Sequence, residues 1–172
     1  MQPNLAIHHV CGLDELRVAP LSSADRVVSI LDPWAPDPDE LRSIEAPVLV
    51  LRFDDTIDAR DAAAPRAAHI RGLLAFDAGA HEGERLVVHC SAGISRSTGA
   101  LAVLLAARHP ELNDEIFAAI RTMRPIAWRN SLVVSLGDEL LGRRGGLISA
   151  LHRHYDVQRR NDSLAHPSTS SG

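Results

Sequence analysis

The sequence contains no lysine, only two cysteines and few aromatic residues. Its 18 basic residues, histidine aside, are all arginine, and aromatic residues make up 3% of the chain. So few aromatic side chains argue against a stacking platform for single-stranded nucleic acid. The net charge of -4 argues against a general polyanion binder. We therefore expect no nucleic-acid partner.

The two cysteines, Cys11 and Cys90, are too few for the disulfide framework of a small secreted domain. The longest apolar run, residues 99–107, is too short to cross a bilayer. The first residues, MQPNLAIHHVCG, lack the basic-then-apolar order of a signal peptide. Together these absences predict a protein of the reducing cytoplasm, with free thiols and no membrane partner.

A length of 172 residues and a hydrophobic content of 45% predict one well-buried domain. Short runs rich in Val and Ile predict strands, at residues 5–10, 26–31, 48–53 and 86–89. Helical spacing of apolar residues predicts helices, at 65–80, 97–108, 113–124, 132–140 and 147–155. We therefore expect an α/β domain over residues 1–157, with a central, mostly parallel sheet flanked by helices and a helical C-terminal half. Residues 158–172 are polar and Ser-rich, and we expect them to form a disordered tail.

The stretch VVHCSAGISRST, residues 87–98, places a cysteine where a predicted strand ends and a helix begins a few residues later. Between them lies a loop of mostly small residues, namely Ser91, Ala92, Gly93, Ile94 and Ser95. Such a backbone can wrap around a tetrahedral anion, and the helix N-terminus adds partial positive charge. Arg96 can hold two anion oxygens, and Cys90 is favoured as a thiolate by the same surroundings. The stretch predicts an oxyanion site with an activated nucleophile at its base.

Residues 89–97, HCSAGISRS, resemble the phosphate loop of the cysteine-dependent protein tyrosine phosphatases, and the sequence AGISRS is most similar to that of the dual-specificity branch. Residues 24–31 are similar to an early strand of that family, and Met123-Arg124-Pro125 with Asn130 resembles its Arg-Pro…Asn stretch. The usual Pro before Asn130 is absent. The resemblance implies a phosphatase-like fold and a cysteinyl-phosphate intermediate. It also implies that Ser97 hydrogen-bonds the sulfur and that His89 orders the loop by hydrogen bonding.

A phosphate ester needs a proton donor for its leaving oxygen, and a positioned acid typically contributes ~10²–10⁴-fold. In the resembled family this donor is an Asp on the loop after the preceding strand. Here that loop, residues 54–61, offers Asp54, Asp55, Asp58 and Asp61. The family pattern favours Asp55, which stands just before a small polar residue, and then Asp54.

The sequence therefore predicts a phosphomonoester hydrolase that needs no metal or other cofactor. We expect Cys90, Arg96, Asp55 and Ser97 to be catalytic and residues 91–96 to bind the phosphoryl group. The loop has no basic residue inside it, which favours a phosphorylated protein over a highly phosphorylated ring. A small phosphomonoester substrate and a phosphate-binding module without turnover are the alternatives. A further alternative is that Cys11 serves as a redox partner for Cys90. The sequence does not define an oligomeric state.

Overall fold

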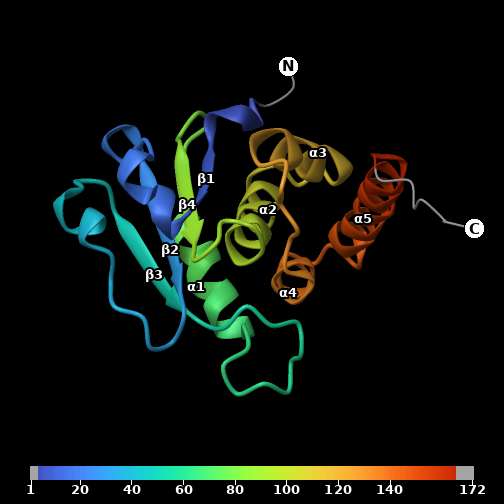
Figure 1. The fold of residues 1–172 in the computed structure, drawn as a ribbon, viewed down its shortest axis with the longest axis horizontal. Coiled ribbons are helices and arrows are strands. Elements are labelled where there is room, and N and C mark those ends of the chain that lie inside the picture. The colour runs from blue at the N-terminus through green and yellow to red at the C-terminus, as the bar shows by residue number, and fades with distance from the viewer. Residues whose placement is uncertain (1–3, 166–172) are drawn as a thin grey trace, which may run out of the picture.

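A four-stranded parallel sheet forms the centre of the protein in the computed structural model, which describes residues 4–165 (Figure 1). The strands are β1 (His9–Gly12), β2 (Arg26–Leu31), β3 (Val48–Arg52) and β4 (Leu86–Cys90), in the order β1-β4-β2-β3. All three pairings are parallel. The inner strands β2 and β4 are almost fully buried, as expected of strands covered on both faces. The predicted α/β fold with a parallel sheet is confirmed.

The first strand lies later in the chain than the sequence predicts. Residues Leu5–Ile7 form a short 3-10 helix, η1, because the Asn4 side chain accepts a hydrogen bond from the Ala6 N–H and caps it. Strand β1 begins only at His9, where the chain can pair with Val87 of β4. Cys11, expected after this strand, therefore lies within it. Three further 3-10 helices also escaped the sequence analysis: η2 (Leu13–Val18), η3 (Leu21–Ser23) and η4 (Asp39–Ser43).

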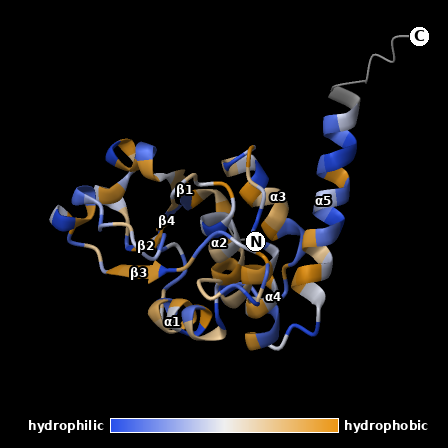
Figure 2. Ribbon diagram, turned by 60° about the horizontal axis from the view of Figure 1, so that its bottom comes forward, coloured by the Kyte–Doolittle hydropathy of each residue, from blue (hydrophilic) through white to orange (hydrophobic). Residues whose placement is uncertain are grey.

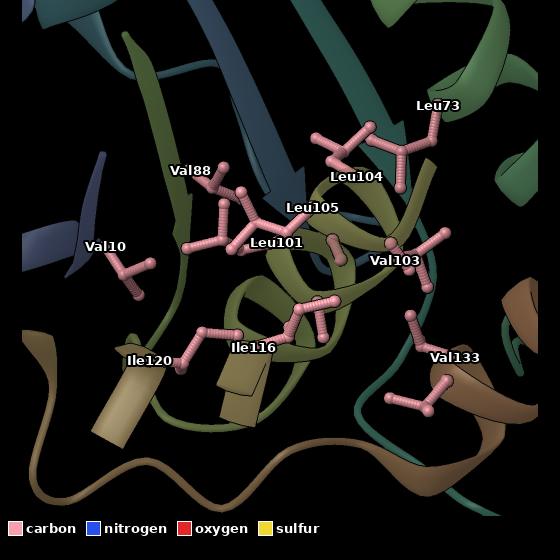
Figure 3. Packing of buried hydrophobic residues seen from close by; sticks show 14 of the residues in the cluster. Val10, Leu73, Val88, Leu101, Val103, Leu104, Leu105, Ile116, Ile120 and Val133 are labelled. Carbon is pink, nitrogen blue, oxygen red and sulfur yellow. The ribbon is translucent and has the colours of Figure 1, made fainter. Parts of the chain in front are cut away.

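Five α-helices complete the described part of the chain: α1 (Ala67–Asp77), α2 (Arg96–Arg108), α3 (Asp114–Met123), α4 (Ser131–Leu140) and α5 (Gly146–Ala165). Figure 1 shows α2 to α5 together on one side of the sheet. Helix α2 is central because residues 96–106 are all buried, and it packs against the sheet, α1, α3 and α4. Figure 3 shows strand and helix side chains meeting on it, including Val10, Val88, Leu101, Leu105, Ile116, Ile120 and Val133. This packing fixes the first turn of α2 against the end of β4.

Helix α5 continues well past the boundary expected at Gln158. It runs to Ala165, and its distal half is hydrophilic in Figure 2, whereas its beginning near α4 carries apolar residues. Tyr155 and Gln158 are buried, which anchors the helix on the rest of the domain. Residues 158–165 of the expected tail belong to α5, and residues 166–172 lie outside the described part. Among residues 4–165, no helix has both the length and the apolar character needed to cross a membrane.

Candidate active site

Parallel strands bring their carboxyl ends to one edge of the sheet, where α/β proteins commonly bind ligands. At this edge β4 ends in Cys90, β2 is followed by Asp32, and β3 is followed by the loop that carries Asp55. The fold thereby gathers residues from three separate parts of the sequence around the loop between β4 and α2.

Cys90 lies at the base of this loop with 2% of its surface exposed. Its Sγ accepts a hydrogen bond from the backbone N–H of Gly93 at 3.3 Å. The Ser97 Oγ, in the first turn of α2, lies 3.1 Å from the same sulfur. The structure therefore places the hydroxyl of Ser97 where the family resemblance implies it.

The carbonyl groups of all five loop residues, 91–95, face outward and accept hydrogen bonds from the surrounding protein. The Leu13 N–H donates to the Ser91 carbonyl at 3.0 Å, and the Arg124 guanidinium donates to the carbonyls of Ala92 at 3.2 Å and Gly93 at 3.0 Å. The Trp128 N–H donates to the Ile94 carbonyl at 2.9 Å, and the Asn130 N–H donates to the Ser95 carbonyl at 3.1 Å. The N–H groups of Ala92, Ile94 and Ser95 find no acceptor among residues 4–165. Outward carbonyls leave the amides on the inner side of the loop, which is the arrangement of an anion-binding nest.

Gly93 is the point at which the loop meets strand β1. Its φ is +67°, and a Cβ there would lie 2.6 Å from the carbonyl oxygen of Cys11 and closer still to the neighbouring backbone of Gly12. Only glycine accommodates both the left-handed backbone and this approach. The glycine at the third loop position is therefore required by the packing of the loop on β1.

An ion pair between Arg124 and Glu15 supports the outer side of the loop. Arg124 Nη1 lies 2.8 Å from Glu15 Oε1, and Glu15 Oε2 accepts the Gly12 N–H at 2.6 Å. The hydrogen bond from Arg124 is the main cause that lowers the pKa of Glu15. The sequence analysis named Arg124 only as part of a resemblance and missed Glu15. Glu15 has no local signal, because its partner Arg124 lies 109 residues further along the chain.

Arg96 is 3% exposed and is held on three sides. Its Nη1 donates to Asp32 Oδ1 at 2.7 Å and to the Phe53 carbonyl at 2.8 Å, and its Nη2 donates to Ser91 Oγ at 2.9 Å. Asp32 was missed by the sequence analysis. The available signal was an acidic residue directly after a buried strand.

Asp55 is the loop carboxylate that the structure brings to the cysteine loop. Its Oδ1 accepts hydrogen bonds from Ser95 Oγ at 2.6 Å and from Asn130 Nδ2 at 2.9 Å. Asn130 also donates to the Thr56 carbonyl at 3.1 Å, and its Oδ1 caps α4 by accepting the Val133 N–H at 3.0 Å. Asn130 therefore joins the start of α4 to the loop that carries Asp55.

The carboxylates of Asp58 and Asp61, on the same loop, have local partners. Asp58 forms an exposed ion pair with Arg60 at 2.9 Å, and Asp61 Oδ1 accepts the Ala63 N–H at 2.9 Å. Asp54 holds the loop through its backbone, since its N–H donates to the Ala63 carbonyl at 2.8 Å. The geometry thus favours Asp55 over its three neighbours for a role at the cysteine loop.

His89 and Cys11 lie behind the loop as neighbours across the β1–β4 pairing. Burial lowers the pKa of His89 to about 4, and neither of its ring nitrogens has a hydrogen-bond partner within residues 4–165. The hydrogen-bonding role expected for His89 is therefore not seen. Burial raises the pKa of Cys11 to about 12, and both cysteines are free thiols. In the described part of the chain, no group of three His, Cys, Asp or Glu side chains is arranged to hold a metal ion.

No protein-family model and no curated protein sequence matches the chain. Solved structures do match its fold. Human DUSP28 superposes with a TM-score of 0.55 at 17% identity, covering 91% of this chain and 96% of its own. DUSP15 gives a TM-score of 0.56 at 21% identity, covering 93% and 96%. The active form of Tk-PTP gives 0.56 at 22% identity, covering 78% and 89%.

These matches extend over most of both chains in each comparison. The chain therefore has the fold of the cysteine-dependent protein tyrosine phosphatases, in the form found in the dual-specificity branch. The expectation drawn from the cysteine loop is confirmed for the fold.

Proposed function

We propose that the protein is a metal-independent phosphomonoester hydrolase that acts through a cysteinyl-phosphate intermediate on phosphorylated proteins. The observation that carries this proposal is the cysteine loop, with its five carbonyls turned outward and its sulfur contacted by Gly93 N–H and Ser97 Oγ. A nucleophile at the base of an anion nest is suited to attack on a bound phosphoryl group.

In the first step the Cys90 thiolate attacks phosphorus, and the bond from phosphorus to the leaving oxygen breaks. The inward amides and Arg96 stabilise the charge on the three remaining phosphoryl oxygens. Asp55 donates a proton to the leaving oxygen. Both hydrogen bonds to Asp55 fall on Oδ1, so Oδ2 is the oxygen available to carry that proton.

In the second step water attacks phosphorus and the sulfur–phosphorus bond breaks. The Asp55 carboxylate accepts the proton of the water, and inorganic phosphate leaves. Ser97, 3.1 Å from the sulfur, stabilises the departing thiolate by hydrogen bonding. A free thiol is needed in each cycle, and the reducing cytoplasm that we propose as its location maintains one.

The substrate class follows from the groups that line the loop. Arg96 is the one cationic side chain of residues 90–97, and it is matched to a single phosphoryl group rather than to a ring bearing several. We therefore propose a phosphoprotein, with the phosphate on Tyr, Ser or Thr.

Hydrolysis of p-nitrophenyl phosphate in the presence of EDTA tests the proposal. Wild type should turn over, Cys90→Ser should be inactive, and Asp55→Asn should be slowed by about 10²-fold or more. Asp58→Asn is the matched control, because Asp58 lies on the same loop but pairs with Arg60. Activity needs a thiolate and a protonated acid together, so the pH profile should be bell-shaped with an optimum below neutral.

Three results would count against this assignment. An unaffected Asp55→Asn with a slow Asp54→Asn moves the acid to Asp54. A flat profile from about pH 5 to 8 removes the acid step altogether. An inert wild type that still binds vanadate shows a phosphate-binding module without turnover.

A further inference from the structure

A groove of about 360 Å³ lies directly beside the cysteine loop. It begins at Ser95 and Asn130, the two residues that hold Asp55, and continues along α5 past Tyr155 to Arg159. Ile57, two residues after Asp55 on the same loop, also lines it. The groove is therefore continuous with the place where the phosphoryl group of a substrate would sit.

Two aromatic rings form one apolar part of the groove. The rings of Trp128 and Tyr155 stack in parallel, with centroids 4.6 Å apart and an interplanar angle of 10°. Trp128 is 38% exposed and Ile57 is 68% exposed, so two large apolar side chains face solvent beside the proposed active site. Exposed apolar surface gathered in a concave site is typical of ligand recognition.

Hydrogen bonds to neighbouring backbone hold the segment that carries the stacked Trp128 and Tyr155 rings in place. The buried guanidinium of Arg129 donates to the Phe117 carbonyl of α3 at 2.9 Å, and the Tyr155 hydroxyl donates to the Arg129 carbonyl. Arg129 stands where the resembled family usually has a proline. The groove is thus preformed, and an occupant need not order its walls, which lowers the cost of binding.

The charges of the groove largely cancel. Arg159 lies over the Trp128 ring at 5.7 Å and within 3.7 Å of the Asp156 carboxylate. Ser131 and His152 also line the groove, and their polar side chains can bond a peptide backbone. An occupant with an uncharged apolar side chain on a polar main chain fits these surroundings better than an anionic ring does.

We propose that this groove binds a large apolar side chain, such as Leu or Phe, next to the phosphorylated residue of a substrate peptide. The inference rests on the proposed function and narrows its substrate class. Binding energy from such a neighbour increases kcat/KM for the correct peptide, and Ile57 and Trp128 set the preference.

Phosphopeptides that differ at one position test the groove. In a parent peptide with Ala around the phosphorylated residue, Leu is introduced in turn at each position from two before to two after it. At one position Leu should raise kcat/KM about tenfold over Ala, the effect of a side chain entering an apolar pocket. In the variants Ile57→Ser and Trp128→Ala, the ratio of kcat/KM for the Leu peptide to kcat/KM for the Ala peptide should fall toward one. Val18→Ser is the matched control, because Val18 is 80% exposed and lies on η2, away from the groove.

The ratio separates this inference from the proposed function. No turnover of p-nitrophenyl phosphate by wild type refutes the proposed function itself. Turnover with equal kcat/KM for all peptides refutes only the proposal that the groove binds an apolar side chain. A preference for Glu over Leu, or a Leu preference that is unchanged in both variants, refutes it as well. A higher kcat/KM for a monophosphorylated phospholipid in vesicles than for any peptide overturns the peptide as the occupant.

Discussion

The replacement Gly93→Ala tests how closely the cysteine loop depends on its contact with β1. The new Cβ would stand 2.6 Å from the Cys11 carbonyl oxygen and closer still to Gly12 N, whereas ordinary van der Waals contact begins at 3.4 Å, so the loop must move by more than about 0.8 Å. The left-handed φ of +67° costs an alanine about 1 kcal/mol. The displacement also weakens the hydrogen bonds from Arg124 Nε to Gly93 O and from Gly93 N to Cys90 Sγ, at about 1 kcal/mol each.

The free energy of unfolding should therefore fall by about 3 kcal/mol, which lowers Tm by roughly 6–12 °C for a domain of this size. Because the moved amides no longer match the phosphoryl oxygens, kcat/KM should fall by about 10²-fold or more. Gly79→Ala is the matched control, since Gly79 has a φ of +83° but no atom within 4 Å of a new Cβ. It should lower Tm by only about 2–4 °C and leave turnover intact.

Thermal unfolding and p-nitrophenyl phosphate hydrolysis measure both effects on the same preparations. Equal Tm shifts in Gly93→Ala and Gly79→Ala, with turnover retained in both, would refute the close contact between the loop and β1. A larger Tm shift with unchanged turnover would refute the link between the amide positions and activity.

Two further predictions concern Asn130 and His8. Asn130→Ser keeps a favoured cap for α4 but loses the amide that donates to Asp55 and to the Thr56 carbonyl, so kcat should fall about tenfold while Tm falls by only about 2–4 °C. A kcat equal to that of wild type would show that Asp55 needs no such support. Burial lowers the pKa of His8 to about 4, and its Nδ1 accepts the Leu86 N–H. The folded pKa is below the unfolded value of 6.5, so this contribution to stability is present above pH 6.5 and is lost as the pH falls toward 4. Tm measured from pH 7 down to pH 4 should decrease. The decrease should be less steep in His8→Asn, which retains an acceptor for the Leu86 N–H but does not titrate. Parallel curves for the two proteins would show that His8 does not cause the pH dependence.

The sequence predicted those parts of the site that are contiguous in the chain. Cys90, Arg96 and the small residues between them form a single strand–loop–helix unit, so their spacing alone indicates an anion site. The buried strands β2 and β4 were also predictable, because their apolar runs are short and bounded by turn formers. In both cases local chemistry and tertiary structure require the same residues.

Most contacts that support the site could not be predicted, because they form only in the folded chain. Arg124 was named through the family resemblance alone, and the position of Asp32 directly after a buried strand was the one local signal. Asp32, Glu15 and Arg124 are ordinary charged residues in the sequence, and each acquires its role from a partner far along the chain. The error at residues 5–7 has a similar origin. Leu5 is buried, as a strand residue would be, but a side-chain cap from Asn4 selects a 3-10 helix there.

The ion pair between Glu15 and Arg124 has a consequence for the order in which the protein becomes functional. One partner follows the first strand and the other follows α3, and together they hold Gly12, Ala92 and Gly93. During synthesis the cysteine loop leaves the ribosome before Arg124 does, and it then lacks the donor for two of its carbonyls. The loop therefore gains the support of Arg124 only after the chain has been made well past it. The shape of the cysteine loop accordingly depends on residues near both ends of the domain, and a nascent chain, or one shortened past Glu15, lacks part of what holds this shape.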